Sequence, residues 1–157
     1  MTLTVAPVRK QIVVDVPAQR AFDVFTEGMA TWWPLATHHI GAVDAETVVV
    51  EPRVGGRCYE RGVDGSECTW GHVREWDPPN AFVFTWEISA DFAADPTMAS
   101  EVAVRFVAES PTRTRVEVEH RGLEHFGARA QEMHDTFASG GGWPALLDLY
   151  AASANPT

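Results

Sequence analysis

Residues 57–88 read RCYERGVDGSECTWGHVREWDPPNAFVFTWEI and decide the fold, because they contain two hairpins in succession. Asp64-Gly65 is a preferred two-residue turn between alternating strands. This turn predicts three facing pairs across the first hairpin: Cys58 with Gly71, Tyr59 with Trp70, and Glu60 with Thr69. We therefore expect an antiparallel meander whose registers follow from its turns.

The second hairpin turns at Asp77-Pro78-Pro79-Asn80. It predicts two facing pairs: Val73 with Phe84, and Gly71 with Trp86. Because successive residues of a strand alternate between its faces, one inner face collects a common set: Cys58, Glu60, Thr69, Gly71, Val73, Phe82, Phe84, Trp86 and Ile88. Gly71 has no side chain, which leaves room for Trp86. Tyr59 and Trp70 then share the outer face, as a cross-strand pair or as a patch where another subunit docks.

The N-terminal part of the chain predicts a strand followed by short helical structure. Apolar residues alternate over residues 8–16, which is typical of a half-buried strand. Pro17 opens a short helix with one apolar stripe, and Gly28 ends it. A second short strand is predicted over residues 47–50.

The C-terminal part predicts a further hairpin and a long helix. The hairpin joins residues 101–109 to residues 113–121 and places Val102 opposite His120 on the inner face. Residues 128–152 read as helix, kinked or divided at Gly140-Gly141-Gly142 and Pro144. The apolar face of the sheet must be covered, and this helix is the only element long enough. We therefore expect an α+β fold: a curved antiparallel sheet of six to seven strands around the C-terminal helix, with two short helices after the first strand.

Composition bounds the class of protein. The chain has 157 residues, which predicts a single domain over residues 1–157. Its 22 acidic and 12 basic residues give a net charge of -10, which disfavours nucleic acid and anionic membranes as partners, since both need a cationic surface. No apolar run approaches the roughly 20 residues of a membrane span, and the N-terminus lacks the pattern of a signal peptide. We expect a cytoplasmic protein.

Metal sites and disulfides are disfavoured by the same sequence. Two cysteines form neither a secreted disulfide framework nor a four-cysteine zinc site. The adjacent His38 and His39 diverge in an extended segment, so they do not chelate. We expect no metal and no cofactor.

Short segments spread over most of the chain resemble one superfamily: Val16-Pro17-Ala18 with Ala21-Phe22, Trp32-Trp33-Pro34, Glu51-Pro52-Arg53-Val54-Gly55-Gly56-Arg57, Trp70-Gly71-His72-Val73, Trp76-Asp77-Pro78-Pro79, Phe84-Thr85-Trp86 and Gly142-Trp143-Pro144. They are similar to the helix-grip (SRPBCC, START-like) superfamily, and within it to the branch named after the activator of the heat-shock-protein-90 ATPase. The resemblance implies a sheet wrapped around a C-terminal helix. It does not imply one function, because the fold hosts carriers, cyclases, hydrolases and chaperone partners. Cys58 stands where the family usually has a large aromatic residue, which implies an enlarged pocket or a local repacking.

A curved sheet around a helix leaves a gap, and the gap is a cavity wherever side chains do not fill it. We expect these candidate ligand-binding side chains to line it: Trp32, Trp33, Cys58, Glu60, Thr69, Phe84, Trp86, Phe106, His120 and Trp143. Flat aromatic rings suit a flat apolar ligand, although the same rings also serve plain core packing.

Two of these residues are titratable. Glu60 is either a general base or polar anchor in an apolar pocket, or a solvated residue at the open rim of the sheet. His120 either bonds a ligand or shuttles protons, or is a core histidine satisfied by a neighbour. On a flat sheet at about 4.8 Å per strand they would lie about 19 Å apart, so we expect no direct dyad.

Three functions remain open from the sequence. The first is binding of a small hydrophobic or aromatic ligand between sheet and C-terminal helix. The second, implied by the resemblance alone, is a co-chaperone that activates an ATPase through protein contact. The third is a cyclase-like or hydrolase-like enzyme that uses Glu60 or His120. The sequence favours a protein that is not an enzyme, with a small apolar ligand, a chaperone or a second copy of the chain as partner.

Overall fold

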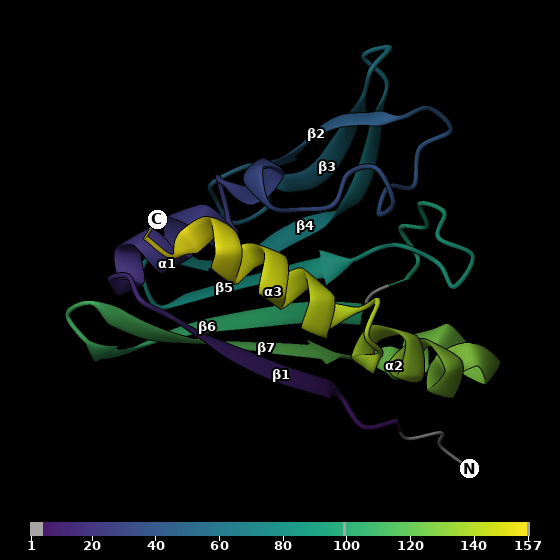
Figure 1. The fold of residues 1–157 in the computed structure, drawn as a ribbon. Coiled ribbons are helices and arrows are strands. Elements are labelled where there is room, and N and C mark those ends of the chain that lie inside the picture. The colour runs from purple at the N-terminus through teal and green to yellow at the C-terminus, as the bar shows by residue number, and fades with distance from the viewer. Residues whose placement is uncertain (1–4, 99, 157) are drawn as a thin grey trace.

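The computed structural model describes residues 5–98 and 100–156, and it contains one curled antiparallel sheet with helices on one face (Figure 1). The strands are β1 (Val8–Val14), β2 (Ala45–Val50), β3 (Arg57–Gly62), β4 (Glu67–Asp77), β5 (Ala81–Trp86), β6 (Ser100–Ser110) and β7 (Arg113–Arg121). Their order in the sheet is β1-β7-β6-β5-β4-β3-β2. The predicted helix-grip fold is therefore confirmed.

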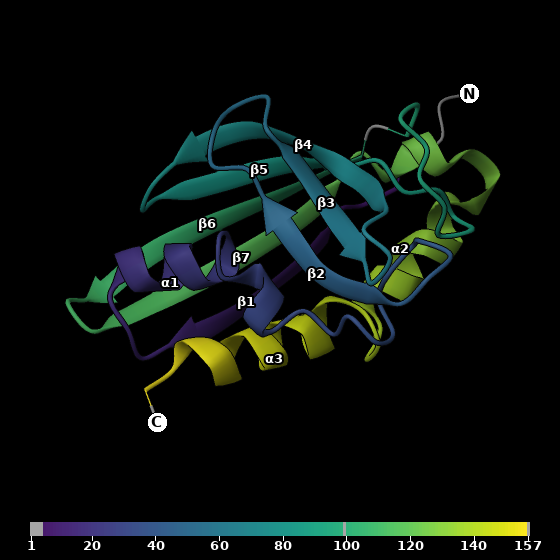
Figure 2. The same ribbon diagram turned by 90° about the horizontal axis from the view of Figure 1, so that it is seen from above.

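Helical segments follow the first strand and the last strand. They are α1 (Ala18–Phe25), the 3-10 helix η1 (Met29–Thr31), the 3-10 helix η2 (Leu123–Arg129), α2 (Ala130–Ala138) and α3 (Trp143–Ala154). The glycines at 140–142 divide the predicted C-terminal helix, so that α2 and α3 are separate. Figure 2 shows α1 and α3 side by side, and the Tyr150 hydroxyl joins them by donating to the Ala21 carbonyl at 2.8 Å. No helix of the described residues is long and apolar enough to cross a membrane.

The first hairpin departs from the predicted register at Trp70. Cys58 faces Gly71 as expected, but the register then shifts, so that Tyr59 faces Thr69 and Glu60 faces Cys68. The predicted pairs of Tyr59 with Trp70 and of Glu60 with Thr69 are wrong. The physical reason is a β-bulge, in which one extra residue of β4 has no partner on β3.

The bulge decides which face carries Trp70. Its side chain is 2% exposed and packs against Trp33, with ring centroids 5.0 Å apart. The guanidinium of Arg57 lies over the Tyr59 ring, 4.1 Å from its centroid. The predicted outer placement of Trp70 beside Tyr59, as a cross-strand pair or as a patch where another subunit docks, is therefore wrong.

The second hairpin and the β6–β7 hairpin each contain a predicted pair, although the register shifts between Val73 and Glu75 in the first and between Ala108 and Ser110 in the second. Val73 faces Phe84, and Val102 faces His120, as predicted. The prediction that Gly71 makes room for the Trp86 ring is wrong, because a β-carbon at this position would overlap the Thr85 carbonyl oxygen of the neighbouring strand. Gly71 is thus required by the close approach of two backbones and not by the Trp86 ring.

The core lies between the inner face of the sheet and the helices α1 and α3. Phe22 of α1 packs edge-on against Phe106 with ring centroids 5.2 Å apart, and Phe25 packs against Tyr150 at 5.1 Å. Both Phe84 and Trp86 are buried on this face, as predicted. Aromatic rings therefore fill much of the space between the sheet and α3. The β3–β4 hairpin curls away from this core (Figure 1).

Candidate functional site

An apolar pocket opens at the curled end of the sheet. Its volume is about 320 Å³, at the lower end of the range for small-molecule sites. Its lining residues come from the loop after η1, from β4 and β5, and from the segment after β5: Trp33, Thr37, His38, His39, Ile40, Trp70, Trp86, Ile88 and Phe92. Among the described residues, none of those that line it belongs to α3.

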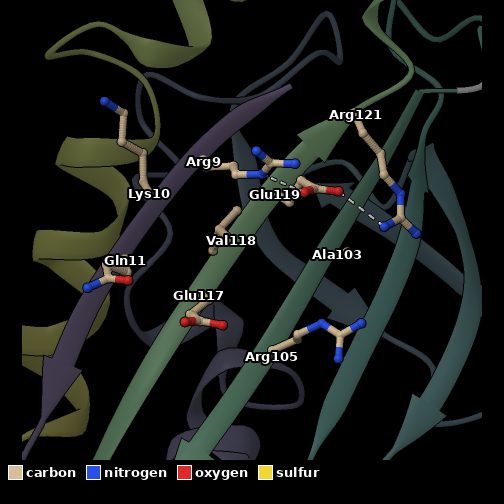
Figure 3. A pocket seen from close by; sticks show the side chains of 9 residues that line it. All are labelled: Arg9, Lys10, Gln11, Ala103, Arg105, Glu117, Val118, Glu119 and Arg121. Carbon is tan, nitrogen blue, oxygen red and sulfur yellow. Dashed lines mark hydrogen bonds and ion pairs between the residues drawn. The ribbon is translucent and has the colours of Figure 1, made fainter. Parts of the chain in front are cut away.

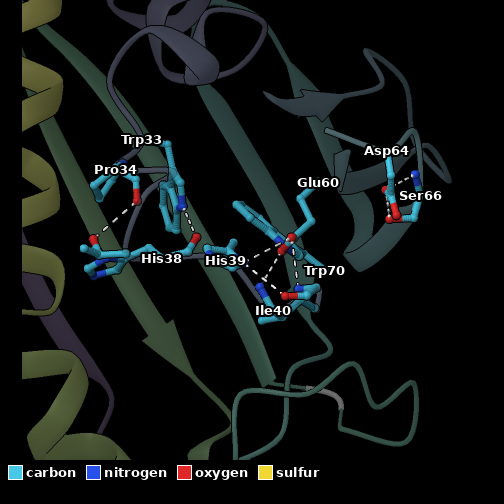
Figure 4. Close-up of polar contacts among 11 residues, drawn as sticks. Trp33, Pro34, His38, His39, Ile40, Glu60, Asp64, Ser66 and Trp70 are labelled. Carbon is cyan, nitrogen blue, oxygen red and sulfur yellow. Dashed lines mark hydrogen bonds and ion pairs between the residues drawn. The ribbon is translucent and has the colours of Figure 1, made fainter. Parts of the chain in front are cut away.

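The buried carboxylate of Glu60 fixes one wall of this pocket (Figure 4). Glu60 is 1% exposed, so the interpretation that it is solvated at the rim is wrong. Its Oε1 accepts the backbone N–H of Ile40 at 2.6 Å and the indole N–H of Trp70 at 2.9 Å. Its Oε2 accepts the backbone N–H of Gly41 at 3.0 Å. Three donors from two segments thus satisfy a charge that would otherwise be costly to bury.

The loop that Glu60 holds is also bonded to the aromatic wall. Trp33 Nε1 donates to the His38 carbonyl at 2.8 Å, and the His38 N–H donates to the Pro34 carbonyl at 2.9 Å (Figure 4). His39 Nδ1 lies 3.9 Å from Glu60 Oε2. The loop over residues 37–41 therefore has a defined conformation at the mouth of the pocket, although it contains no helix or strand.

Phe92 lines the pocket in a strained backbone conformation. Its φ is 58°, in the left-handed region that bulky side chains rarely adopt. A tight turn holds it, since the Phe92 N–H donates to the Ser89 carbonyl at 2.9 Å and the Ser89 N–H to the Ala93 carbonyl at 2.8 Å. The ring is 48% exposed, which leaves one side to solvent and one to the pocket.

His120 lies deep in the core, where its hydrogen bonds are internal. Its Nδ1 accepts the Trp143 indole N–H at 3.2 Å, and its Nε2 lies 3.2 Å from Ser100 Oγ. Ser100 Oγ in turn donates to the Trp86 carbonyl at 3.2 Å. Burial lowers the pKa of His120 to about 3, because desolvation disfavours the charged ring. The interpretation of His120 as a satisfied core histidine is confirmed.

The structure places the other predicted site residues as follows. The Trp32 indole N–H donates to the Val24 carbonyl at 2.8 Å. The Phe84 ring stacks on the Phe82 ring, with ring centroids 5.1 Å apart. Phe106 and Trp143 are buried in the core. Thr69 is half-buried on β4. Cys58 is buried, and desolvation raises the pKa of its thiol to about 12. Of the ten candidates, the pocket brings together only Trp33 and Trp86.

Sequence reasoning missed most of the other lining residues. Trp70 was assigned to the wrong face because alternation cannot reveal a bulge. Residues 37–40 and Phe92 lie in loops with no periodicity, and only Ile88 had been placed on the inner face. The signal for the loop was Glu60 itself, since a carboxylate on an inner face requires donors from elsewhere.

Two further depressions lie outside this pocket. One, of about 640 Å³, spreads over β1, β7 and β6, where Glu119 bonds Arg9 at 2.8 Å and Arg121 at 3.3 Å (Figure 3). The other, of about 490 Å³, contains His72, whose Nδ1 lies 2.8 Å from the Glu87 carboxylate. Among the described residues, no Trp, Phe or Tyr side chain lines either depression.

Known proteins of the same fold resemble this chain in sequence as well as in structure. A family profile described as "Activator of Hsp90 ATPase homolog 1-like protein" matches residues 15–152. The anthrahydroquino-γ-pyrone synthase Txn09 is 36% identical with a TM-score of 0.66, over 94% of this chain and 96% of that chain. CalC, a self-sacrificing resistance protein from Micromonospora echinospora, is 32% identical with a TM-score of 0.72, over 95% of this chain and 94% of that chain.

A more distant structure shares the fold alone. The Aha1 dimer from Colwellia psychrerythraea is 11% identical with a TM-score of 0.64, over 96% of this chain and 97% of that chain. No curated protein matches the chain. Because the family profile spans most of the sequence, and two solved structures of similar length are 36% and 32% identical to it, the chain belongs to the Activator of Hsp90 ATPase homolog 1-like family.

Proposed function

We propose that this protein binds a small, flat, largely apolar molecule in the pocket between the 37–40 loop, β4, β5 and Phe92. The observation that carries the proposal is the aromatic wall, in which Trp33, Trp70, Trp86 and Phe92 surround about 320 Å³ of space. Aromatic side chains that converge on a concave site favour planar ligands through stacking and edge contacts.

The name of one relative supports a planar ligand with oxygen substituents. The name of the 36% identical synthase contains an anthrahydroquinone and a pyrone, both of which are planar ring systems. The pocket of this chain is small, so it fits two or three fused rings better than a long polycyclic chain. We therefore place its ligand among compact oxygenated aromatic compounds.

The contacts of the two titratable candidates favour binding over catalysis. Glu60 already accepts three N–H groups, and His120 is completely buried and bonded to Trp143 and Ser100. Neither residue lines the pocket. An enzyme that used either as acid or base would have to break these bonds first, so we propose a binding protein.

Activation of an ATPase is the alternative that the family description raises. No residue of the described chain adds a specific argument for it. A direct assay decides it: addition of this protein to a purified heat-shock-protein-90-type chaperone should leave the rate of ATP hydrolysis unchanged if small-molecule binding is its role.

The proposal is tested with fluorene, a planar tricyclic hydrocarbon, titrated into the full chain and followed by calorimetry. The variant Phe92→Ala removes part of the pocket wall without disturbing the core, since the ring is 48% exposed. We expect its affinity for fluorene to fall about 5-fold, as for loss of roughly 1 kcal/mol of apolar contact. The matched control is Leu149→Ala on α3, where an apolar side chain is 43% exposed away from the pocket.

The expected result is weaker binding by Phe92→Ala and unchanged binding by Leu149→Ala. Absence of binding by the unmodified chain to fluorene and to its ketone, 9-fluorenone, would overturn the proposal. Equal effects of the two substitutions would place the ligand elsewhere and would also overturn it.

A further inference from the structure

One buried donor, on a tryptophan that lines the pocket, has no acceptor. Trp86 is 7% exposed, and among residues 5–98 and 100–156 its Nε1 is the only buried side-chain nitrogen or oxygen without a hydrogen-bond partner. Burial of an unpaired N–H is unfavourable, and such groups in native structures call for an explanation. The explanation is either structural tolerance or a partner that is not part of the chain.

The other buried indoles behave differently. Each of them donates to an acceptor within the protein: Trp32 to the Val24 carbonyl, Trp33 to the His38 carbonyl, Trp70 to the Glu60 carboxylate, and Trp143 to the His120 ring. This fold therefore satisfies its tryptophan donors with internal acceptors as a rule. Trp86 departs from the rule, and it is also a lining residue of the pocket.

The packing of the Trp86 ring fixes its position. Its centroid lies 5.2 Å from that of His120, 5.6 Å from that of Phe137 and 6.3 Å from that of Trp143. These three ring neighbours leave the Trp86 ring little freedom to rotate toward an acceptor in the core. A new partner for its N–H must therefore come to the ring.

The polar side chains beside the pocket are already engaged within the chain. The Thr37 hydroxyl bonds His38 Nδ1 at 2.8 Å, and His38 Nε2 bonds the Gly141 carbonyl at 3.1 Å. His39 Nδ1 bonds the Gly41 carbonyl at 3.2 Å. Among the side-chain N–H and O–H donors of the described lining residues, the Trp86 N–H is thus the one without a partner inside the chain.

We propose that the ligand carries a neutral oxygen acceptor, a ring ketone or quinone carbonyl, which accepts a hydrogen bond from Trp86 Nε1. This inference rests on the proposed function and adds to it the chemical class of the ligand. An indole nitrogen only donates, so the ligand group must accept. Among the described residues no Lys or Arg lines the pocket, and the chain has a net charge of -10, so a neutral carbonyl fits better than a carboxylate or phosphate.

A matched pair of probes isolates this hydrogen bond. Fluorene and 9-fluorenone have the same fused rings, and only the ketone has an acceptor. We expect the unmodified chain to bind 9-fluorenone about 5- to 10-fold more tightly than fluorene, as one hydrogen bond in a desolvated site provides. In Trp86→Phe the preference for the ketone should disappear, because the ring wall stays and the N–H is lost.

The control variant is Trp33→Phe, which removes a neighbouring indole N–H that already bonds the His38 carbonyl. It should keep the preference for 9-fluorenone even if both affinities fall. If Trp86→Phe retains the preference, or if Trp33→Phe alone abolishes it, the inference is wrong while the binding function stands. If neither probe binds the unmodified chain, the binding function itself fails.

A second measurement does not depend on the folding of a variant. In the ¹⁵N–¹H spectrum of the unmodified chain, the Trp86 indole N–H should shift downfield on addition of 9-fluorenone and move less on addition of fluorene. Equal shifts with both probes would show that no hydrogen bond forms there, and the inference would fall.

Discussion

The indole N–H of Trp70 donates to the carboxylate of Glu60 at 2.9 Å, inside the hairpin of β3 and β4 (Figure 4). The bulge that turns Trp70 inward makes this bond possible, because strict alternation would place the two side chains on opposite faces. The same carboxylate holds the Ile40 and Gly41 amides. One side chain therefore connects the sheet, an aromatic wall and the loop at the mouth of the pocket.

Glu60→Gln tests this connection. An amide can accept from Ile40 and Trp70 with its oxygen, but its NH2 group then faces the Gly41 N–H, donor against donor. We expect the free energy of unfolding to fall by about 1–3 kcal/mol, measured by urea denaturation. Hydrogen exchange at the Gly41 amide should accelerate.

The control for Glu60 is Glu46→Gln, on an exposed position of the neighbouring strand β2. It removes the same charge without removing a buried acceptor, and stability should stay within about 0.5 kcal/mol of the unmodified chain. Equal losses at the two positions would mean that net charge, and not the hydrogen bonds, is responsible.

Gly71→Ala tests the approach of β4 to β5. The added methyl group would overlap the Thr85 carbonyl oxygen, so the backbones must separate. We expect a loss of about 3 kcal/mol in the free energy of unfolding. In contrast, Gly140→Ala adds a methyl group where no heavy atom lies within 4 Å, and it should be close to neutral. Thermal denaturation of the two variants side by side makes the comparison.

The buried ring of His120 predicts a pH dependence of stability. Its pKa is lowered to about 3 in the folded chain, whereas an unfolded histidine has a pKa of about 6.5. The unfolded state therefore binds a proton first as the pH falls. The contribution of His120 to the free energy of unfolding is therefore fully present above about pH 6.5. It is lost as the pH falls toward 3, at about 1.4 kcal/mol per pH unit.

Urea denaturation between pH 7.5 and 5 measures this slope, in a window above the range in which carboxylates titrate. His120→Gln should lower the free energy of unfolding at every pH. It should also remove the part of its pH dependence that comes from one proton, since an amide does not titrate. His125→Gln, at an exposed position, should retain it. A slope that survives in His120→Gln would assign the proton to another group.

Because the backbone at Phe92 is strained, we expect the glycine variant at this position to be more stable than the alanine variant, the reverse of the usual order. Phe92→Ala keeps a side chain at a φ of 58°, whereas Phe92→Gly relieves that conformation. The glycine variant should be more stable than the alanine variant by about 1 kcal/mol. At Val63, which is exposed and has no such φ, the order should be the usual one, with glycine less stable than alanine. Paired denaturation curves at each position provide the check.

Turns with defined chemistry allowed much of the fold to be predicted. The facing of Val73 with Phe84 and of Val102 with His120 followed from turn position and strand alternation. The face of Trp70 could not be predicted, because a bulge adds a residue without a distinctive local pattern. The helix break at residues 140–142 was predicted from its glycines, which separate α2 from α3.

The candidate site was less accessible to sequence reasoning than the fold. Residues 37–40 have no periodicity, and their place is set by hydrogen bonds to Glu60, which lies 20 residues after Ile40. The prediction that Glu60 points inward was correct, but its partners could not be named. Trp86 was expected in the cavity wall. That its N–H is unpaired could not be predicted, because this depends on which acceptors surround the ring in three dimensions.

Because of the bulge in β4, the length of the β3–β4 hairpin determines whether Trp70 lines the proposed ligand pocket. Removal of a single residue between Glu60 and Trp70 would remove the bulge and restore regular alternation along β4. The Trp70 side chain would then point to the outer face of the sheet, and the pocket would lose one of its aromatic walls. Within this family, single-residue differences in hairpin length should therefore separate proteins with different ligand preferences more sharply than overall identity does.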